Sequence, residues 1–167
     1  MWATLALSLA ASLASAQEDP CAKFSWNIEH ERALFATSPQ AVAAGHDAAS
    51  APQLEPNRLY QLQLTAAAQV TLALPPGKKS AGDSSYAGLA RLSLAQPGSY
   101  RVSADQPVWI DIVADGKMID SADFQGRSGC LAPHKIVQYS LPAGRELLLQ
   151  LSGAPSAGVR LTITAAG

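Results

Sequence analysis

Apolar and polar residues alternate along most of the chain after residue 57. Tyr60, Leu62 and Leu64 alternate with polar neighbours, and the same period of two recurs in further short segments. This period places successive side chains on opposite faces of an extended strand. Strands are therefore predicted over residues 60–65, 70–74, 89–94, 99–104, 108–114, 117–124, 135–141, 146–151 and 159–164.

Turn-forming residues separate these segments. Asp115-Gly116 joins two of them, and this pair accepts the positive φ angles of a type I′ hairpin turn. Proline and glycine also interrupt the chain at 75–77, 97–98, 142–144 and 152–155. Short strands at regular spacing predict a mainly β protein. We expect an antiparallel β-sandwich, jelly-roll or immunoglobulin-like, with about nine strands.

One short helix is expected before the strands, in an N-terminal segment over residues 17–36. Asn27 is a favourable N-cap, Glu29 and Glu31 suit the first helical turn, and Pro39 ends the pattern. Residues 37–56 are rich in Ala, Gly, Pro, Ser and Gln, which predicts a flexible connector. The β-sandwich domain is then expected over residues 57–167.

The first residues of the chain have the pattern of an export signal. Residues 1–16 are apolar and end in Ala14-Ser15-Ala16, the small-x-small pattern that signal peptidase recognises. The run is short of the about 20 residues that a membrane-spanning helix needs. We predict a signal peptide cleaved after Ala16 and a periplasmic or secreted product that is not embedded in a membrane; an uncleaved anchor is the alternative.

The two cysteines, Cys21 and Cys130, fit an exported protein. An even number of cysteines in such a chain favours a disulfide. Closing a loop of about 100 residues stabilises a fold by up to about 5 kcal/mol on the chain-entropy model. The alternative, a pair of thiolate metal ligands, lacks the close CxxC spacing of typical zinc sites.

The charge balance is close to neutral. The chain has 12 Lys and Arg against 13 Asp and Glu, a net charge of −1, and 15% of its residues are charged. An average globular protein has about 25%. This balance excludes a strongly basic surface, so no nucleic-acid partner is expected.

Two segments carry a family resemblance. Residues 93–103 read SLAQPGSYRVS, and residues 139–153 read YSLPAGRELLLQLSG. Both resemble the corners of the bacterial pre-peptidase C-terminal type of β-sandwich, an exported module. The resemblance covers about the last 110 residues and implies a sandwich in an accessory, substrate-contacting or structural role. It transfers no catalytic residue.

Three further segments resemble a group of small exported bacterial proteins. They are residues 21–26 (CAKFSW), 123–130 (DFQGRSGC) and 133–135 (PHK). Some of those proteins carry a homogentisate 1,2-dioxygenase label, which implies an iron held by histidines and a glutamate. Such a site would need His30, His134 and Glu31 drawn together by the disulfide. The competing interpretation is that His30 is a solvated helix residue and His134 hydrogen-bonds a loop. We expect no metal and no cofactor.

The candidate ligand-binding surface lies around one strand and one loop. In residues 108–114, Val108, Ile110 and Ile112 are expected to fill the core, which leaves Trp109 and Asp111 on the outer face. An exposed aromatic ring beside a carboxylate suits a sugar ring or a peptide. The alternative is that Trp109 faces the core or covers the helix.

The disulfide-pinned segment 124–135 adds Arg127, His134 and Lys135 to this surface. We therefore expect a non-enzymatic binding or accessory module of the cell envelope that contacts a glycan, peptide or protein. A small metal-dependent, homogentisate dioxygenase-like oxidoreductase is the alternative.

Overall fold

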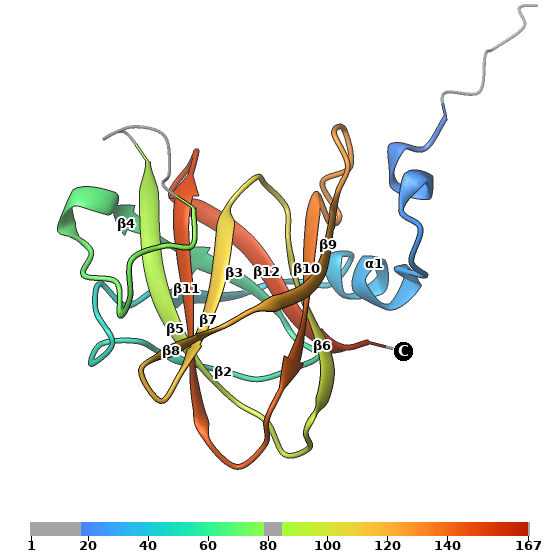
Figure 1. Cartoon of the computed structure of the whole chain (residues 1–167). Helices are drawn as coiled ribbons and strands as arrows, with labels where there is room; N and C mark the ends of the chain where they lie inside the picture. The colour runs from blue at the N-terminus through green and yellow to red at the C-terminus, as the bar shows by residue number, and fades with distance from the viewer. Residues whose placement is uncertain (1–17, 79–84, 167) are drawn as a thin grey trace, which may run out of the picture.

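The computed structural model describes residues 18–78 and 85–166, and these residues form two packed six-stranded β-sheets (Figure 1). Sheet A runs in the order β1 (Gln40–Ala43), β3 (Leu59–Gln63), β12 (Gly158–Ala165), β6 (Gly98–Ala104), β10 (Lys135–Leu141) and β9 (Ser121–Gly126). Sheet B runs in the order β2 (Gln53–Leu54), β5 (Tyr86–Ser93), β11 (Glu146–Ala154), β7 (Trp109–Ala114) and β8 (Lys117–Ile119). The short β4 (Thr65–Ala66) also pairs with β5. The predicted β-sandwich is confirmed.

The core lies between the two sheets and is built by the predicted alternation. Leu62, Val102 and Leu161 project inward from sheet A, and Ile112 and Leu149 project inward from sheet B; each is at most 1% exposed. Alternate residues of the same strands face outward. This period of two lets short strands bury one face each, which supplies most of the stabilisation of a sandwich.

Two helical elements precede the strands, and a third lies between β4 and β5. The chain contains η1 (Pro20–Lys23), α1 (Glu29–Phe35) and η2 (Ala67–Gln69). The N-cap of α1 is Ile28 and not Asn27 as predicted. Asn27 lies one residue earlier, and its Oδ1 still accepts a hydrogen bond of 2.9 Å from the N–H of Glu29, the first residue of the helix. Among the described helices, none is long and apolar enough to cross a membrane.

The disulfide between Cys21 and Cys130 is confirmed. It anchors the N-terminal segment to the loop before β10, where Phe24, Ile28 and Ile136 form a second, smaller apolar cluster around it. The hairpin turn between β7 and β8 is confirmed as well: Asp115 and Gly116 have φ angles of 49° and 72°. The predicted signal peptide and its cleavage position after Ala16 lie outside the described residues.

The structure corrects the predicted strand at 70–74. This segment pairs with no strand among residues 18–78 and 85–166, although its exposure alternates as the sequence suggests. The Leu74 N–H donates to Gln150 Oε1 at 3.3 Å, and Gln150 Nε2 donates to the Leu74 carbonyl at 3.0 Å. The segment therefore lies on the outer face of sheet B, because a side chain of β11 takes the backbone hydrogen bonds that a neighbouring strand would supply.

A second correction concerns the strand predicted over 117–124. The chain leaves sheet B after β8 and enters sheet A as β9, with Asp120 between the two strands. The predicted strand therefore supplies an edge strand to each sheet. The residues of both strands are exposed or half-buried, and their burial does not follow a period of two.

The segment 37–56, predicted as a flexible connector, contains β1 and β2. Both strands pair in parallel, β1 with β3 and β2 with β5, in an otherwise antiparallel sandwich. Between them Gly45 and Leu89 exchange two backbone hydrogen bonds of 2.8 and 2.9 Å. These contacts are made by the backbone, so a run of small residues takes part in both sheets without an apolar pattern of its own.

Candidate functional site

Trp109 and Asp111 lie on the outer face of sheet B, while Val108, Ile110 and Ile112 are buried in the core. The Trp109 indole N–H donates to Asp111 Oδ1 at 2.9 Å. Asp111 Oδ2 accepts from the Gly77 N–H at 3.1 Å. The carboxylate is 6% exposed, so it joins the indole to the loop at residue 77 and is itself withdrawn from solvent.

Lys135 completes this cluster from the other sheet. Its Nζ lies 4.9 Å from the centroid of the Trp109 ring and donates to the Val108 carbonyl at 3.0 Å. Burial lowers the pKa of the Lys135 ammonium and the nearby Lys78 lowers it further, while Asp111 opposes both effects. Three of the five predicted ligand-binding residues are thus together, and they are engaged with one another.

Arg127 and His134 lie apart from that cluster. The Arg127 Nε donates to the Lys23 carbonyl at 2.6 Å, and its guanidinium lies 5.3 Å from the centroid of the Phe24 ring. The His134 N–H donates to Ala104, and its carbonyl accepts from the Arg127 N–H. These contacts join the disulfide loop to the N-terminal segment and to β6.

The histidine–glutamate combination is also separated. His30 Nε2 is hydrogen-bonded to Asn57 Oδ1 at 2.9 Å. Glu31 faces sheet A and accepts hydrogen bonds from Arg101 and Thr164. In the parts of the chain that the structure describes, no three His, Cys, Asp or Glu side chains group as ligands for a metal ion.

A cleft of about 670 Å³ lies between the N-terminal segment and the outer face of sheet A. Its walls come from the approach to α1, from the first turn of α1, from β6 and from the end of β12. The lining residues are Ser25, Trp26, Asn27, Glu29, His30, Glu31, Arg101 and Ala165. Its volume falls within the usual range for small-ligand sites, about 300–1,000 Å³.

Arg101 links both sides of this cleft. Its Nη1 donates to the Asn27 carbonyl at 2.9 Å and contacts Glu31 Oε1 at 3.3 Å, and its Nε donates to Gln138 at 3.2 Å. The guanidinium also lies 4.7 Å from the centroid of the Trp26 ring. A planar cation with several fixed donors holds three chain segments at once. It therefore positions the Trp26 ring in the wall of the cleft.

Two polar groups of the cleft remain open to a ligand. The Trp26 indole N–H and the Glu29 carboxylate make no hydrogen bond to any residue in 18–78 or 85–166. Trp26 is partly exposed and Glu29 is exposed. One group is a donor and the other an acceptor, so the cleft offers both kinds of hydrogen bond beside an aromatic ring.

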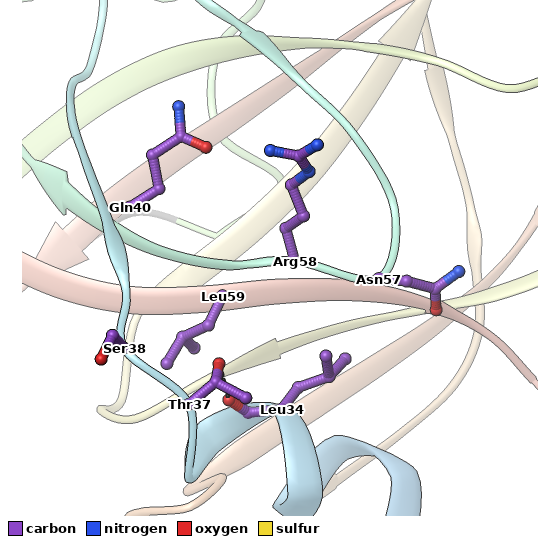
Figure 2. Close-up of a pocket in the computed structure, with 7 residues that line it drawn as sticks. All are labelled: Leu34, Thr37, Ser38, Gln40, Asn57, Arg58 and Leu59. Atoms are coloured by element: carbon purple, nitrogen blue, oxygen red, sulfur yellow. Dashed lines mark hydrogen bonds between the residues drawn. The ribbon is translucent and has the colours of Figure 1, made fainter.

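A smaller pocket of about 270 Å³ lies beyond the other end of α1. Figure 2 shows Arg58 and Gln40 extending away from the helix on one side, and Leu34 and Thr37 at the end of α1 on the other. Arg58 is paired with Glu55 at 3.2 Å, and both side chains are more than half exposed. An exposed ion pair of this kind holds its partners weakly, so this pocket is a poorer site than the cleft.

The sequence did not single out Arg101 or Glu29 as site residues. Arg101 occupies an outward position on β6 between Ser99 and Ser103, where a solvated side chain is the ordinary expectation. Arg101 is buried because α1 packs on this face of sheet A. No local sequence pattern predicts the contact between Arg101 and Glu31, because the two residues are 70 positions apart along the chain.

Comparison with known proteins adds no relative to this picture. No family model matches the chain, and no curated protein sequence matches it. The resemblances to pre-peptidase C-terminal sandwiches and to small exported proteins therefore stay predictions.

Proposed function

We propose that this protein is an exported, non-enzymatic binding module of the cell envelope that contacts a glycan, a peptide or a protein. The apolar segment 1–16 with its small-x-small ending supports export. The disulfide between Cys21 and Cys130 supports an oxidising compartment, where such bonds form and persist.

The cleft beside Trp26 is the observation that carries the binding role. It combines a ligand-sized volume with an aromatic ring and open hydrogen-bonding groups. The N-terminal segment that forms one wall of the cleft is fixed at both ends, by the disulfide at Cys21 and by the contact of α1 with β12. A site that is already ordered loses little conformational entropy when a ligand binds, which favours affinity.

The chemistry of the cleft also suits binding better than turnover. Its buried charges, Glu31 and Arg101, neutralise each other, and Thr164 donates a further hydrogen bond to Glu31 at 3.0 Å. These groups fix the floor of the cleft. The open groups at Trp26 and Glu29 are suited to contact a ligand.

The proposal is tested by screening the purified protein against glycan and peptide arrays. We expect one ligand class to bind and Trp26→Ala to weaken that binding, while Phe124→Ala leaves it unchanged. Phe124 is the matched control because it is an aromatic residue, 67% exposed, outside the cleft. Failure of every class to bind overturns the proposal. So does stoichiometric Fe, Cu or Zn in the wild-type protein that is lost in His134→Ala, which would favour the oxidoreductase alternative.

Export is tested separately by mass spectrometry of the protein recovered from outside the cytoplasm. The expected product begins at Gln17, the residue after the predicted cleavage position. Recovery of the uncleaved chain in the membrane fraction would favour the anchor alternative and overturn the export part of the proposal.

A further inference from the structure

We propose that the ligand of the cleft beside Trp26 is a neutral saccharide, with Trp26 as its aromatic contact and Glu29 as an acceptor for its hydroxyl groups. This inference rests on the proposed binding function and names the ligand class. It follows from the charge, the hydrogen-bonding character and the rigidity of the cleft.

The charge of the cleft disfavours an anionic ligand. The one arginine in its lining, Arg101, is paired with Glu31, and both side chains are buried. Glu29 then leaves a negative charge at the rim that no cation of the described residues pairs. A carboxylate or phosphate ligand would meet this charge with no free cation among the described lining residues to offset it.

The Trp26 ring can meet a ligand with only one of its faces. The Arg101 guanidinium occupies the other face, 4.7 Å from the ring centroid. A pyranose ring presents a flat face of C–H groups, which packs against an indole and removes apolar surface from water. The Trp26 N–H and the Glu29 carboxylate lie on the same lining and suit the hydroxyl groups around such a ring.

The backbone around the cleft disfavours an extended peptide. An extended peptide that binds by strand addition is held by main-chain hydrogen bonds to a free strand edge. The strands beneath the cleft, β6 and β12, lie inside sheet A with neighbours on both sides. The Asn27 carbonyl on the other wall already accepts from Arg101. The cleft therefore offers hydrogen bonds to a ligand through its side chains. Side chains are what a sugar-binding site uses.

The aromatic wall is fixed before any ligand arrives. The Ser25 N–H donates to Gln125 Oε1 at 3.0 Å, and Gln125 Nε2 donates back to Ser25 Oγ at 2.5 Å. Trp26 also packs against the apolar cluster around the disulfide. Saccharides gain little free energy from each contact in water, so a wall that needs no ordering favours their binding.

The test is a titration of the purified protein with neutral oligosaccharides of glucose, mannose and N-acetylglucosamine, followed by calorimetry and by the indole N–H signals in NMR spectra. At least one of them should bind and shift the Trp26 signal. Trp26→Ala should weaken binding about tenfold or more, and Glu29→Gln should weaken it severalfold. Phe124→Ala should bind as the wild type does. Trp26→Phe, which keeps an aromatic ring, should retain part of the affinity if Trp26→Ala fails to fold.

The outcomes separate this inference from the proposed function. A galacturonate oligomer or a peptide that binds at Trp26 while all neutral saccharides fail overturns the ligand class and leaves a binding module. A saccharide that binds the wild type, Trp26→Ala, Trp26→Phe and Glu29→Gln equally overturns the site. Failure of all these probes and of the wider arrays overturns the proposed function together with the inference.

Discussion

The Glu31 carboxylate of α1 and the Arg101 guanidinium of β6 form a buried ion pair at 3.3 Å, with side chains 2% and 9% exposed. This pair holds the helix on the outer face of sheet A by a polar contact. Thr164 and the Asn27 carbonyl supply further hydrogen bonds to its two members. A buried ion pair with its remaining groups satisfied is costly to break from one side, because the surviving charge stays in a poorly solvated place.

Removal of one partner of this pair should therefore destabilise the protein strongly. We expect Glu31→Ala, which leaves Arg101 unpaired, to lower the free energy of unfolding by about 3–5 kcal/mol. The double variant Glu31→Met with Arg101→Met should cost clearly less than the two single changes added together, because neither charge is then stranded. Urea unfolding of the wild type, Glu31→Ala, the two single variants Glu31→Met and Arg101→Met, and the double variant measures these values. Additive costs would show that the pair is not coupled.

Loss of the disulfide should lower the stability of the protein, because this bond anchors the N-terminal segment to the loop before β10. It closes a separation of 109 residues, and loss of such a bond from a small exported domain costs about 2–5 kcal/mol. We expect Cys21→Ser with Cys130→Ser to lower the melting temperature. A reductant should lower the wild type to the same level and leave the variant unchanged. Two free thiols in the denatured, unreduced wild-type protein would contradict the bond itself.

The sequence predicted well those elements that have a local signal of their own, either hydrophobic alternation or turn-forming residues. The alternation at Tyr60, Leu62 and Leu64 led to β3, and the Asp115-Gly116 pair led to the β7–β8 turn. By contrast, β1 and β2 join the edges of existing strands through their backbones. Their residues are small or polar, so no hydrophobic period marks them, and their pairing depends on partners that are distant in sequence.

The candidate site was less visible because it is assembled by tertiary contact. Trp109 and Asp111 were found together on the outer face of sheet B, as the alternation predicted, because the period of two fixes which side chains share a face. The cleft depends instead on α1 lying across β6, which brings Glu31 to Arg101. Helix docking on a sheet face leaves no local signature when the contact is polar.

Gly45, the single glycine of the segment 37–56, should not tolerate a larger side chain. A Cβ at this position would lie 2.6 Å from both the Cα and the N of Ala51. Because these are backbone atoms, Gly45→Ala should destabilise by about 2–3 kcal/mol. Gly98→Ala is the matched control: its nearest contact would be Tyr100 at 3.9 Å, with no positive φ. Equal unfolding midpoints for the two variants would contradict the close approach.

The pKa of Lys135 should make stability depend on pH in the alkaline range. Burial lowers the pKa of this ammonium below its ordinary value of 10.5. Between the two values the unfolded chain binds more protons than the folded protein, so stability rises with pH there. Lys135→Met should remove this rise.

The raised pKa of Tyr139 acts in the opposite direction above pH 10.0, but it is common to both proteins. The difference between the two unfolding curves therefore isolates Lys135. The wild type should gain stability relative to the variant as the pH approaches 10.5. A constant difference across this range would contradict the shift.

The β9 edge of sheet A should be hindered in pairing with another chain, because side chains bond to two of its backbone groups. β9 is the last strand of the sheet. The Phe124 N–H donates to Asp123 Oδ1 and the Gly126 carbonyl accepts from Arg127 Nη1, both at 2.8 Å. A strand with some of its outward groups already bonded is a poorer template for strand addition. Asp123→Ala frees one donor beside the exposed Phe124 ring and should promote concentration-dependent self-association in sedimentation experiments. Asp120→Ala, a control three residues earlier between β8 and β9, should stay monomeric if the wild type does, and equal behaviour of the two variants would refute this role.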